Sequence, residues 1–87
     1  MLRNKAMADE SATMSNEDRL IYMANQIARN FGTLPHDQAA RAVADHIVSF
    51  WDPRMRALIF RLQEAGDTRI GDIAARAIAI LRAARKS

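Results

Sequence analysis

Two histidines and the carboxylates near them are the side chains of this sequence best suited to metal binding or acid–base chemistry. His36 and His46 lie ten residues apart, whereas two histidines on one face of a metal-binding helix are four residues apart. Asp45 adjoins His46, but the pair alone defines no ligand set. We interpret both histidines as surface or helix-end residues and expect no metal site.

The hydroxyl and acidic residues give no stronger indication of catalysis. No G-x-S-x-G motif is present, so no serine is predicted on the strand–turn–helix elbow that activates it. Asp45 and Asp52 fall two helical turns apart, but Pro53 follows Asp52 and favours a helix-capping role for it. We therefore expect no enzymatic activity and no cofactor bound by this chain.

Four segments with helical periodicity position these residues and predict an all-α fold, a small bundle of about four short helices. They cover approximately residues 16–31, 35–50, 53–64 and 70–85. The residue types that begin helices stand at the expected places: Ser15, Asp52 and Thr68 as N-caps and Pro35 in a first turn. Short connections favour antiparallel neighbours in the bundle.

Each segment carries apolar residues three or four positions apart, which predicts one buried face per helix. The predicted face of the second segment ends with Phe50. Ile78 lies off the predicted face of the last segment. This position indicates a second apolar contact, either inside the domain or with a partner.

The chain's length limits what its core can do. Its 87 residues predict one helical domain over residues 15–87, preceded by a disordered extension over residues 1–14 that has no secretory signal. A domain of this size buries only about 60% of its unfolded surface. No cysteine is available for disulfides, which leaves a partner protein as the expected source of additional stability. No stretch approaches the roughly 20 apolar residues of a membrane span, and the lack of cysteine suits a cytoplasmic protein.

Charge is unevenly distributed along the chain. Residues 1–52 carry five basic and seven acidic side chains, whereas residues 53–87 carry eight basic and three acidic ones. A basic half of this kind meets either nucleic acid or an acidic protein surface. The last segment offers Ala and Ile beside its arginines, whereas base-reading helices present Asn, Gln, Ser or Thr. A small nucleic-acid-binding domain is therefore the alternative rather than the main prediction.

Residues 50–56, FWDPRMR, are unusual for a plain helical bundle. Trp and Arg are enriched in binding hot spots, but Trp51 and Met55 also suit the core at a helix corner, and both interpretations stay open. Arg54 and Arg56 are harder to bury and are better explained by carboxylates on a partner. Asn25 and Gln26 are adjacent, so one amide faces away from the apolar stripe of its helix.

Two blocks of sequence resemble a known family. Residues 19–27, RLIYMANQI, are similar to the R/K-L-x-x-M-A-N-Q-I opening of the delta subunit of NAD-dependent formate dehydrogenases. Residues 44–56, ADHIVSFWDPRMR, resemble that family's A-D-H-I/L-x-x-F-W-x-P-R-M-R core. The resemblance covers about residues 17–66. Residues 67–72, DTRIGD, stand where the family usually has a Leu-x-Pro-Leu-type segment.

The resemblance implies a partner rather than a reaction. In that family the delta chain accompanies a catalytic alpha subunit with a molybdenum or tungsten bis-pterin cofactor and iron–sulfur clusters, and other subunits hold FMN and bind NAD. The cytoplasmic complex oxidises formate to carbon dioxide. The role that we expect for the delta chain is to stabilise the catalytic subunit or to assist its assembly and cofactor insertion. The contact residues implied for this chain are Met23, Asn25, Gln26, Trp51, Asp52, Arg54, Met55 and Arg56.

Overall fold

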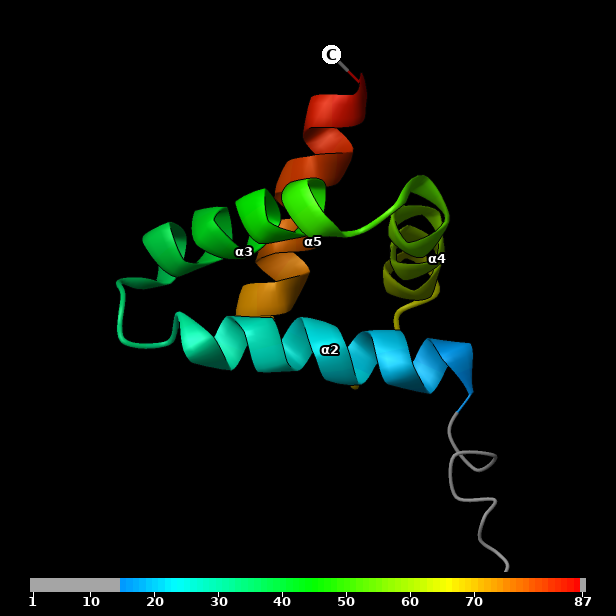
Figure 1. Ribbon diagram of the computed structural model, residues 1–87, viewed down its shortest axis with the longest axis horizontal. Coiled ribbons are helices and arrows are strands. Elements are labelled where there is room, and N and C mark those ends of the chain that lie inside the picture. The colour runs from blue at the N-terminus through cyan, green and yellow to red at the C-terminus, as the bar shows by residue number, and fades with distance from the viewer. Residues whose placement is uncertain (1–14, 87) are drawn as a thin grey trace, which may run out of the picture.

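Residues 15–86 form four α-helices in the computed structural model (Figure 1). These are α2 (Asn16–Asn30), α3 (His36–Phe50), α4 (Pro53–Glu64) and α5 (Asp72–Lys86). No strand occurs within residues 15–86, and the all-α prediction is confirmed. The predicted N-terminal extension, residues 1–14, lies outside the described residues, as does Ser87.

The first three helices begin close to where the sequence predicts. Ser15 and Asp18 form a capping box, in which the Asp18 N–H donates to Ser15 Oγ at 3.1 Å and the Ser15 N–H donates to Asp18 Oδ2 at 3.3 Å. Asp52 caps α4 by accepting the Met55 N–H at 2.9 Å, with Pro53 as the first helical residue. Pro35 immediately precedes α3 instead of lying in its first turn.

The end of α4 depends on a glycine. Gly66 has a φ of 80°, which L side chains rarely adopt. Its N–H donates to Gln63 O at 2.9 Å, and the Asp67 N–H donates to Leu62 O at 3.1 Å. This pair of bonds is a Schellman motif, and it ends α4 at Glu64.

Thr68 does not cap the last helix, and this prediction is wrong. The chain turns at residues 67–70, where Asp67 Oδ1 accepts the Arg69 N–H at 3.0 Å. Helix α5 begins at Asp72, and the Gly71 carbonyl accepts the Ala75 N–H at 2.8 Å. The Asp67 side chain thus stabilises a turn at the place where the residue type of Thr68 indicates a helix cap.

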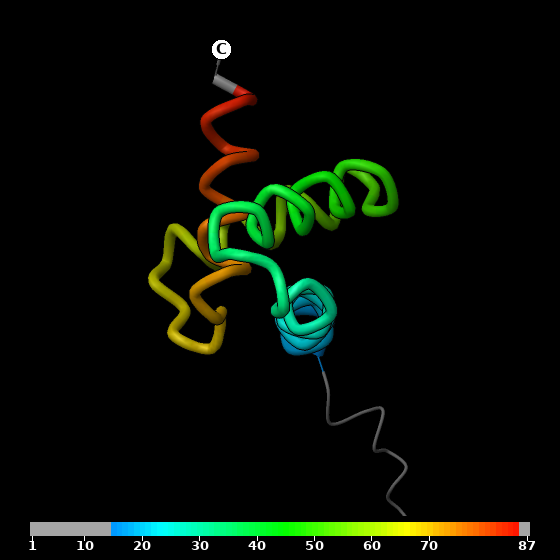
Figure 2. Tube along the Cα trace, turned by 90° about the vertical axis from the view of Figure 1, so that its left-hand side faces the viewer, coloured from blue at the N-terminus to red at the C-terminus, as the bar shows by residue number. Residues whose placement is uncertain are grey.

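The helices cross one another instead of lying antiparallel. The chain reverses between α2 and α3, but the view along α2 shows α3 running across it and α5 rising away from both (Figures 1 and 2). The break at Trp51 and Asp52, whose extended backbones have ψ values of 139° and 169°, turns α4 away from α3. Helix α2 contacts each of the other three helices, and α5 packs most extensively on α3.

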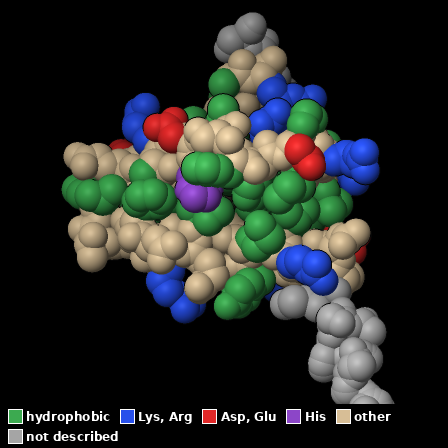
Figure 3. Space-filling model, in the orientation of Figure 1, with side chains coloured by type: hydrophobic (Ala, Val, Ile, Leu, Met, Phe, Trp, Pro, Cys, Tyr) green, Lys and Arg blue, Asp and Glu red, His purple; other side chains and the backbone are tan. Residues whose placement is uncertain are grey.

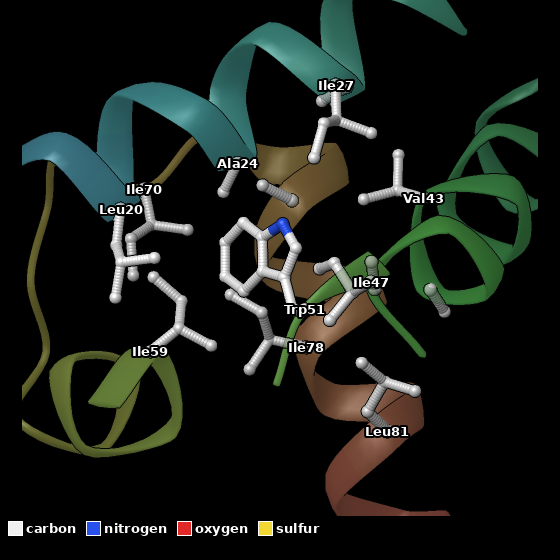
Figure 4. Packing of buried hydrophobic residues seen from close by; sticks show 14 of the residues in the cluster. Leu20, Ala24, Ile27, Val43, Ile47, Trp51, Ile59, Ile70, Ile78 and Leu81 are labelled. Carbon is white, nitrogen blue, oxygen red and sulfur yellow. The ribbon is translucent and has the colours of Figure 1, made fainter. Parts of the chain in front are cut away.

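One hydrophobic core joins all four helices. Trp51 lies at its centre, surrounded by side chains from α2, α3, α4 and α5 (Figure 4). Ile47, Ile59 and Ile78 are fully buried around it. The buried Ile78 settles the alternative left open by the sequence, because its second apolar contact lies inside the domain, where α5 touches three other helices.

Phe50 was expected on the buried face of its helix, and this prediction is wrong. Its side chain is 73% exposed. Helix α3 ends at Phe50, and the chain then turns so that the next residue, Trp51, enters the core. Phe50 packs instead beside His46, with ring centroids 4.6 Å apart.

Candidate docking surface

The residues considered for catalysis do not converge. His36 is exposed at the start of α3, and His46 is half-buried about 15 Å further along the same helix at 1.5 Å per residue. Within residues 15–86 no three His, Cys, Asp or Glu side chains lie together in a way that would hold a metal ion. The features of the domain that bear on its function are therefore those of its surface.

Two predicted contact residues at the helix break are bound inside the domain. Asp52 serves as the N-cap of α4. The half-buried Arg56 donates from Nη1 to Trp51 O at 3.0 Å and to Val48 O at 3.4 Å. Its positive charge therefore lies at the C-terminal end of α3, where carbonyls are free to accept. Arg56 does not need a partner's carboxylate, and its contact with a partner stays a prediction.

Trp51 and Asn25 also have internal roles. Trp51 is only 4% exposed and fills the core, as one of its two interpretations predicts. Asn25 Nδ2 donates to Arg69 O at 2.8 Å, while the Gly71 N–H donates to Asn25 Oδ1 at 2.9 Å. This Asn25 bridge connects α2 to the loop before α5. It uses the amide's donor and acceptor together, which accounts for an asparagine here without any partner.

The other four predicted contact residues, Met23, Gln26, Arg54 and Met55, line an open groove. Its first part lies between α2 and α4, has a volume of about 470 Å³ and includes Arg19, Leu20, Leu58 and Arg61. Its second part lies between α2 and the end of α3, has a volume of about 390 Å³ and includes Tyr22, His46, Phe50 and Trp51. Met23 and Met55 line both parts, so we treat them as one groove with an arginine half and an aromatic half.

The groove is visible as a hydrophobic band on one face of the molecule. In the space-filling view, green side chains gather between α2 and α3 with a histidine among them, and basic side chains lie at the edges (Figure 3). Tyr22 and Phe50 are 56% and 73% exposed. Single exposed apolar residues are ordinary, but contiguous ones next to a groove mark interaction sites.

Sequence reasoning missed four groove residues, Arg19, Tyr22, Phe50 and Arg61. Arg54 and Arg61 stand two turns apart on one side of α4, and this spacing is the sequence signal that could have identified Arg61. Tyr22 stands beside the buried stripe of α2, and an aromatic at such a position is the available signal for an exposed contact. Arg19 was recognisable only as part of the matched family block.

Most arginines of the basic half are paired inside the domain. Arg69 forms ion pairs with Asp18 and with Asp67, Arg82 Nη2 lies 2.5 Å from Glu64 Oε2, and Arg76 Nη2 lies 3.5 Å from Asp37 Oδ1. Arg85 lies over the Phe60 ring, 5.2 Å from its centroid. The last helix therefore presents fewer free cations than its sequence indicates, and this weakens the case for nucleic-acid binding.

The Arg69 cluster also changes the titration of its acids. Hydrogen bonds from the Arg69 side chain hold the pKa values of Asp18 and Asp67 below their ordinary value of 3.8. Both carboxylates in turn raise the pKa of Arg69. The cluster fastens the N-terminal turn of α2 to the loop between α4 and α5.

Residues 15–86 form a small all-helical domain with an open apolar groove flanked by arginines, which is a type of surface that protein-binding modules use. The family model of the NADH-dependent formate dehydrogenase delta subunit, FdsD, matches residues 19–78. The chain belongs to this family, whose members are subunits of a formate dehydrogenase complex. The match continues into α5, beyond the segment on which the sequence resemblance rests. No curated protein and no solved structure matches the chain.

None of the helices in residues 15–86 combines the length and the apolar character needed to cross a membrane.

Proposed function

We propose that this chain is a non-catalytic delta subunit that docks on the catalytic alpha subunit of a cytoplasmic NAD-dependent formate dehydrogenase. That complex oxidises formate to carbon dioxide and reduces NAD⁺. Docking stabilises the alpha subunit or assists its assembly and cofactor insertion. The observation that carries the proposal is the open groove, because six of the eight contact residues implied by the resemblance line it: Met23, Gln26, Trp51, Asp52, Arg54 and Met55.

The chemistry of the donor set supports a role without a cofactor of its own. Iron–sulfur clusters are held by cysteine thiolates, and the chain has no cysteine. We therefore assign the molybdenum or tungsten bis-pterin cofactor, the iron–sulfur clusters and FMN to the partner subunits. The delta chain would act through its contacts alone.

The test is co-expression of the tagged chain with the formate dehydrogenase subunits of its own organism. We expect the alpha subunit to co-purify with the tag and to bring molybdenum or tungsten and formate–NAD activity with it. Without the delta chain, a lower melting temperature of an alpha subunit with normal metal content would indicate stabilisation. A reduced metal content at normal yield would indicate assistance in cofactor insertion.

Two results would contradict the proposal. One is failure of the tagged chain to retain any of the other subunits. The other is an alpha subunit with the same yield, metal content and stability whether or not the delta chain is present.

A further inference from the structure

The groove has a charged half and an apolar half, and this asymmetry specifies what it binds. We propose that its occupant is an amphipathic helical segment of a partner protein, with acidic residues over Arg19, Arg54 and Arg61 and apolar residues over Met23 and Met55. The inference deepens the proposed function and rests on it, since the partner there is another subunit of the complex.

The dimensions of the groove fit a short helix. Along α2 its lining begins at Asn16 and ends at Ile27. Eleven residues at a rise of 1.5 Å make it about 16 Å long, the length of three helical turns. Helix-in-groove binding uses anchor residues at i, i+3 or i+4, and i+7, and three turns supply them.

The two methionines favour apolar side chains of the occupant at the centre of the groove. Met23 and Met55 are half-buried and pack on the core from opposite sides of the groove. Methionine is unbranched and polarisable, so it adapts to the shape of an incoming side chain. Leu20 and Leu58 lie beside them in the arginine half, and this half therefore also has an apolar floor.

Three exposed arginines give the occupant its charge. Arg19, Arg54 and Arg61 line the same part of the groove, and none of them forms an ion pair within residues 15–86. Of the carboxylates, Asp52 alone is among the residues that line this part of the groove, and its Oδ1 accepts the Met55 N–H. Guanidinium groups bind carboxylates through two parallel hydrogen bonds, so acidic residues on the occupant complete this half.

The same asymmetry argues against two other occupants. A second copy of the chain on a twofold axis would present the same patch, which brings three more arginines to the interface and, of the carboxylates that line the arginine half, only Asp52. A nucleic-acid backbone would satisfy the arginines but leave Tyr22 and Phe50 uncovered, since they lie in the aromatic half. An acidic amphipathic helix covers both halves at once.

The first experiment uses the co-expressed complex and two charge-matched variants. Arg54→Gln/Arg61→Gln removes two charges from the groove, and Arg29→Gln/Arg41→Gln removes two from exposed positions outside it. We expect the groove variant to bind the other subunits about tenfold more weakly or worse, with a smaller loss as salt rises. The control variant should bind like wild type, and circular dichroism should show that both are folded.

The second experiment does not depend on the complex. A synthetic amphipathic helical peptide of three to four turns, with Glu beside a Leu stripe, is titrated into the isotope-labelled full chain and followed by NMR. The same peptide with Lys in place of Glu is the control. We expect the Glu peptide alone to shift the amide signals of residues 19–27 and 50–61.

The two experiments separate the possible failures. If the wild-type chain does not assemble with the other subunits but binds the Glu peptide selectively, the proposed function is overturned and the groove inference is supported. Equal assembly of wild type and the groove variant overturns the inference and leaves the proposed function standing. The inference is also overturned if both peptides bind equally, if neither binds, if the groove mediates self-association in light scattering, or if an RNA or DNA oligonucleotide shifts the same signals.

Discussion

The close contact between Gly71 and Asn25 allows a sharp test of the structure. A β-carbon at position 71 would lie 3.2 Å from Asn25 Oδ1, tighter than most real contacts. The backbone at Gly71 does not have a positive φ, so alanine is conformationally acceptable there. The only obstacle is the Asn25 side chain, which its two hydrogen bonds hold in place.

The magnitude follows from two opposing terms. Gly→Ala at a compatible position stabilises by about 0.4–1 kcal/mol because the unfolded chain loses freedom. In the wild-type background the new methyl group displaces Asn25 and weakens two hydrogen bonds, each contributing about 0.5–1.5 kcal/mol. We expect Gly71→Ala to destabilise the wild type by about 0.5–1 kcal/mol. In an Asn25→Ala background the obstacle is gone, and the same substitution should stabilise by about 0.4–1 kcal/mol.

The assay is urea and thermal unfolding of four proteins: wild type, the two single variants and the double variant, followed by helical circular dichroism. For a domain of this size 1 kcal/mol moves the melting temperature by about 4–8 °C, so a change of sign is easily measured. Asn25→Ala alone should cost about 1–2 kcal/mol, because both of its hydrogen bonds are exposed. An identical effect of Gly71→Ala in both backgrounds would refute the Asn25 bridge.

Other consequences of the structure are testable by unfolding. Trp51→Ala should destabilise the isolated chain by about 3–5 kcal/mol as a core truncation. Trp51→Phe should cost less, since within residues 15–86 Trp51 forms hydrogen bonds only through its backbone. Equal effects of the two substitutions would contradict this. Asp52→Ala should lower the stability by about 1 kcal/mol through loss of the α4 cap. Asp52→Asn, which still caps, should retain most of the wild-type stability. Asp18 and Asp67 have lowered pKa values in the folded state, so their contribution to folding stability is full above about pH 4 and is lost as the pH falls through those lower values. Replacing both residues with Asn should make stability less dependent on pH in this range. An unchanged pH dependence would argue against the Arg69 cluster.

The helix boundaries that the sequence predicts well are those set by neighbouring residues. Ser15, Asp52 and Pro53 act within one turn of their own position, so residue type and order are sufficient to place the starts of α2 and α4. Gly66 ends α4 for an equally local reason, its left-handed backbone. Local chemistry of this kind does not depend on how the helices pack.

The start of α5 could not be predicted because a distant residue helps determine it. Thr68 is a good cap by type, but residues 67–70 form a turn supported by Asp67 and by the Asn25 bridge from α2. Asn25 and Gly71 are 46 positions apart, and no spacing rule connects them. The packed structure therefore overrides the local capping preference of Thr68.

The sequence identified the segment that forms the candidate site but not which of its residues face the surface. Tryptophan and arginine types identify a segment with an unusual role, but the same types serve a buried core and a binding surface. Only the direction of the chain after Phe50 decides that Trp51 enters the core while Phe50 stays outside. Likewise Arg56 lies within reach of the α3 carbonyls, whereas Arg54, two positions away, faces the groove.

The internal contacts and the groove are parts of one arrangement. Asp52 caps α4, Arg56 connects α4 to the end of α3, and Asn25 connects α2 to the loop before α5. These contacts fix the helices whose side chains form the groove walls, and a preformed groove loses little entropy when it binds. Substitutions at these three positions should therefore reduce stability and docking together. Substitution of Arg54 or Arg61 should reduce docking while leaving stability unchanged, and this difference distinguishes residues that build the groove from those that contact its occupant.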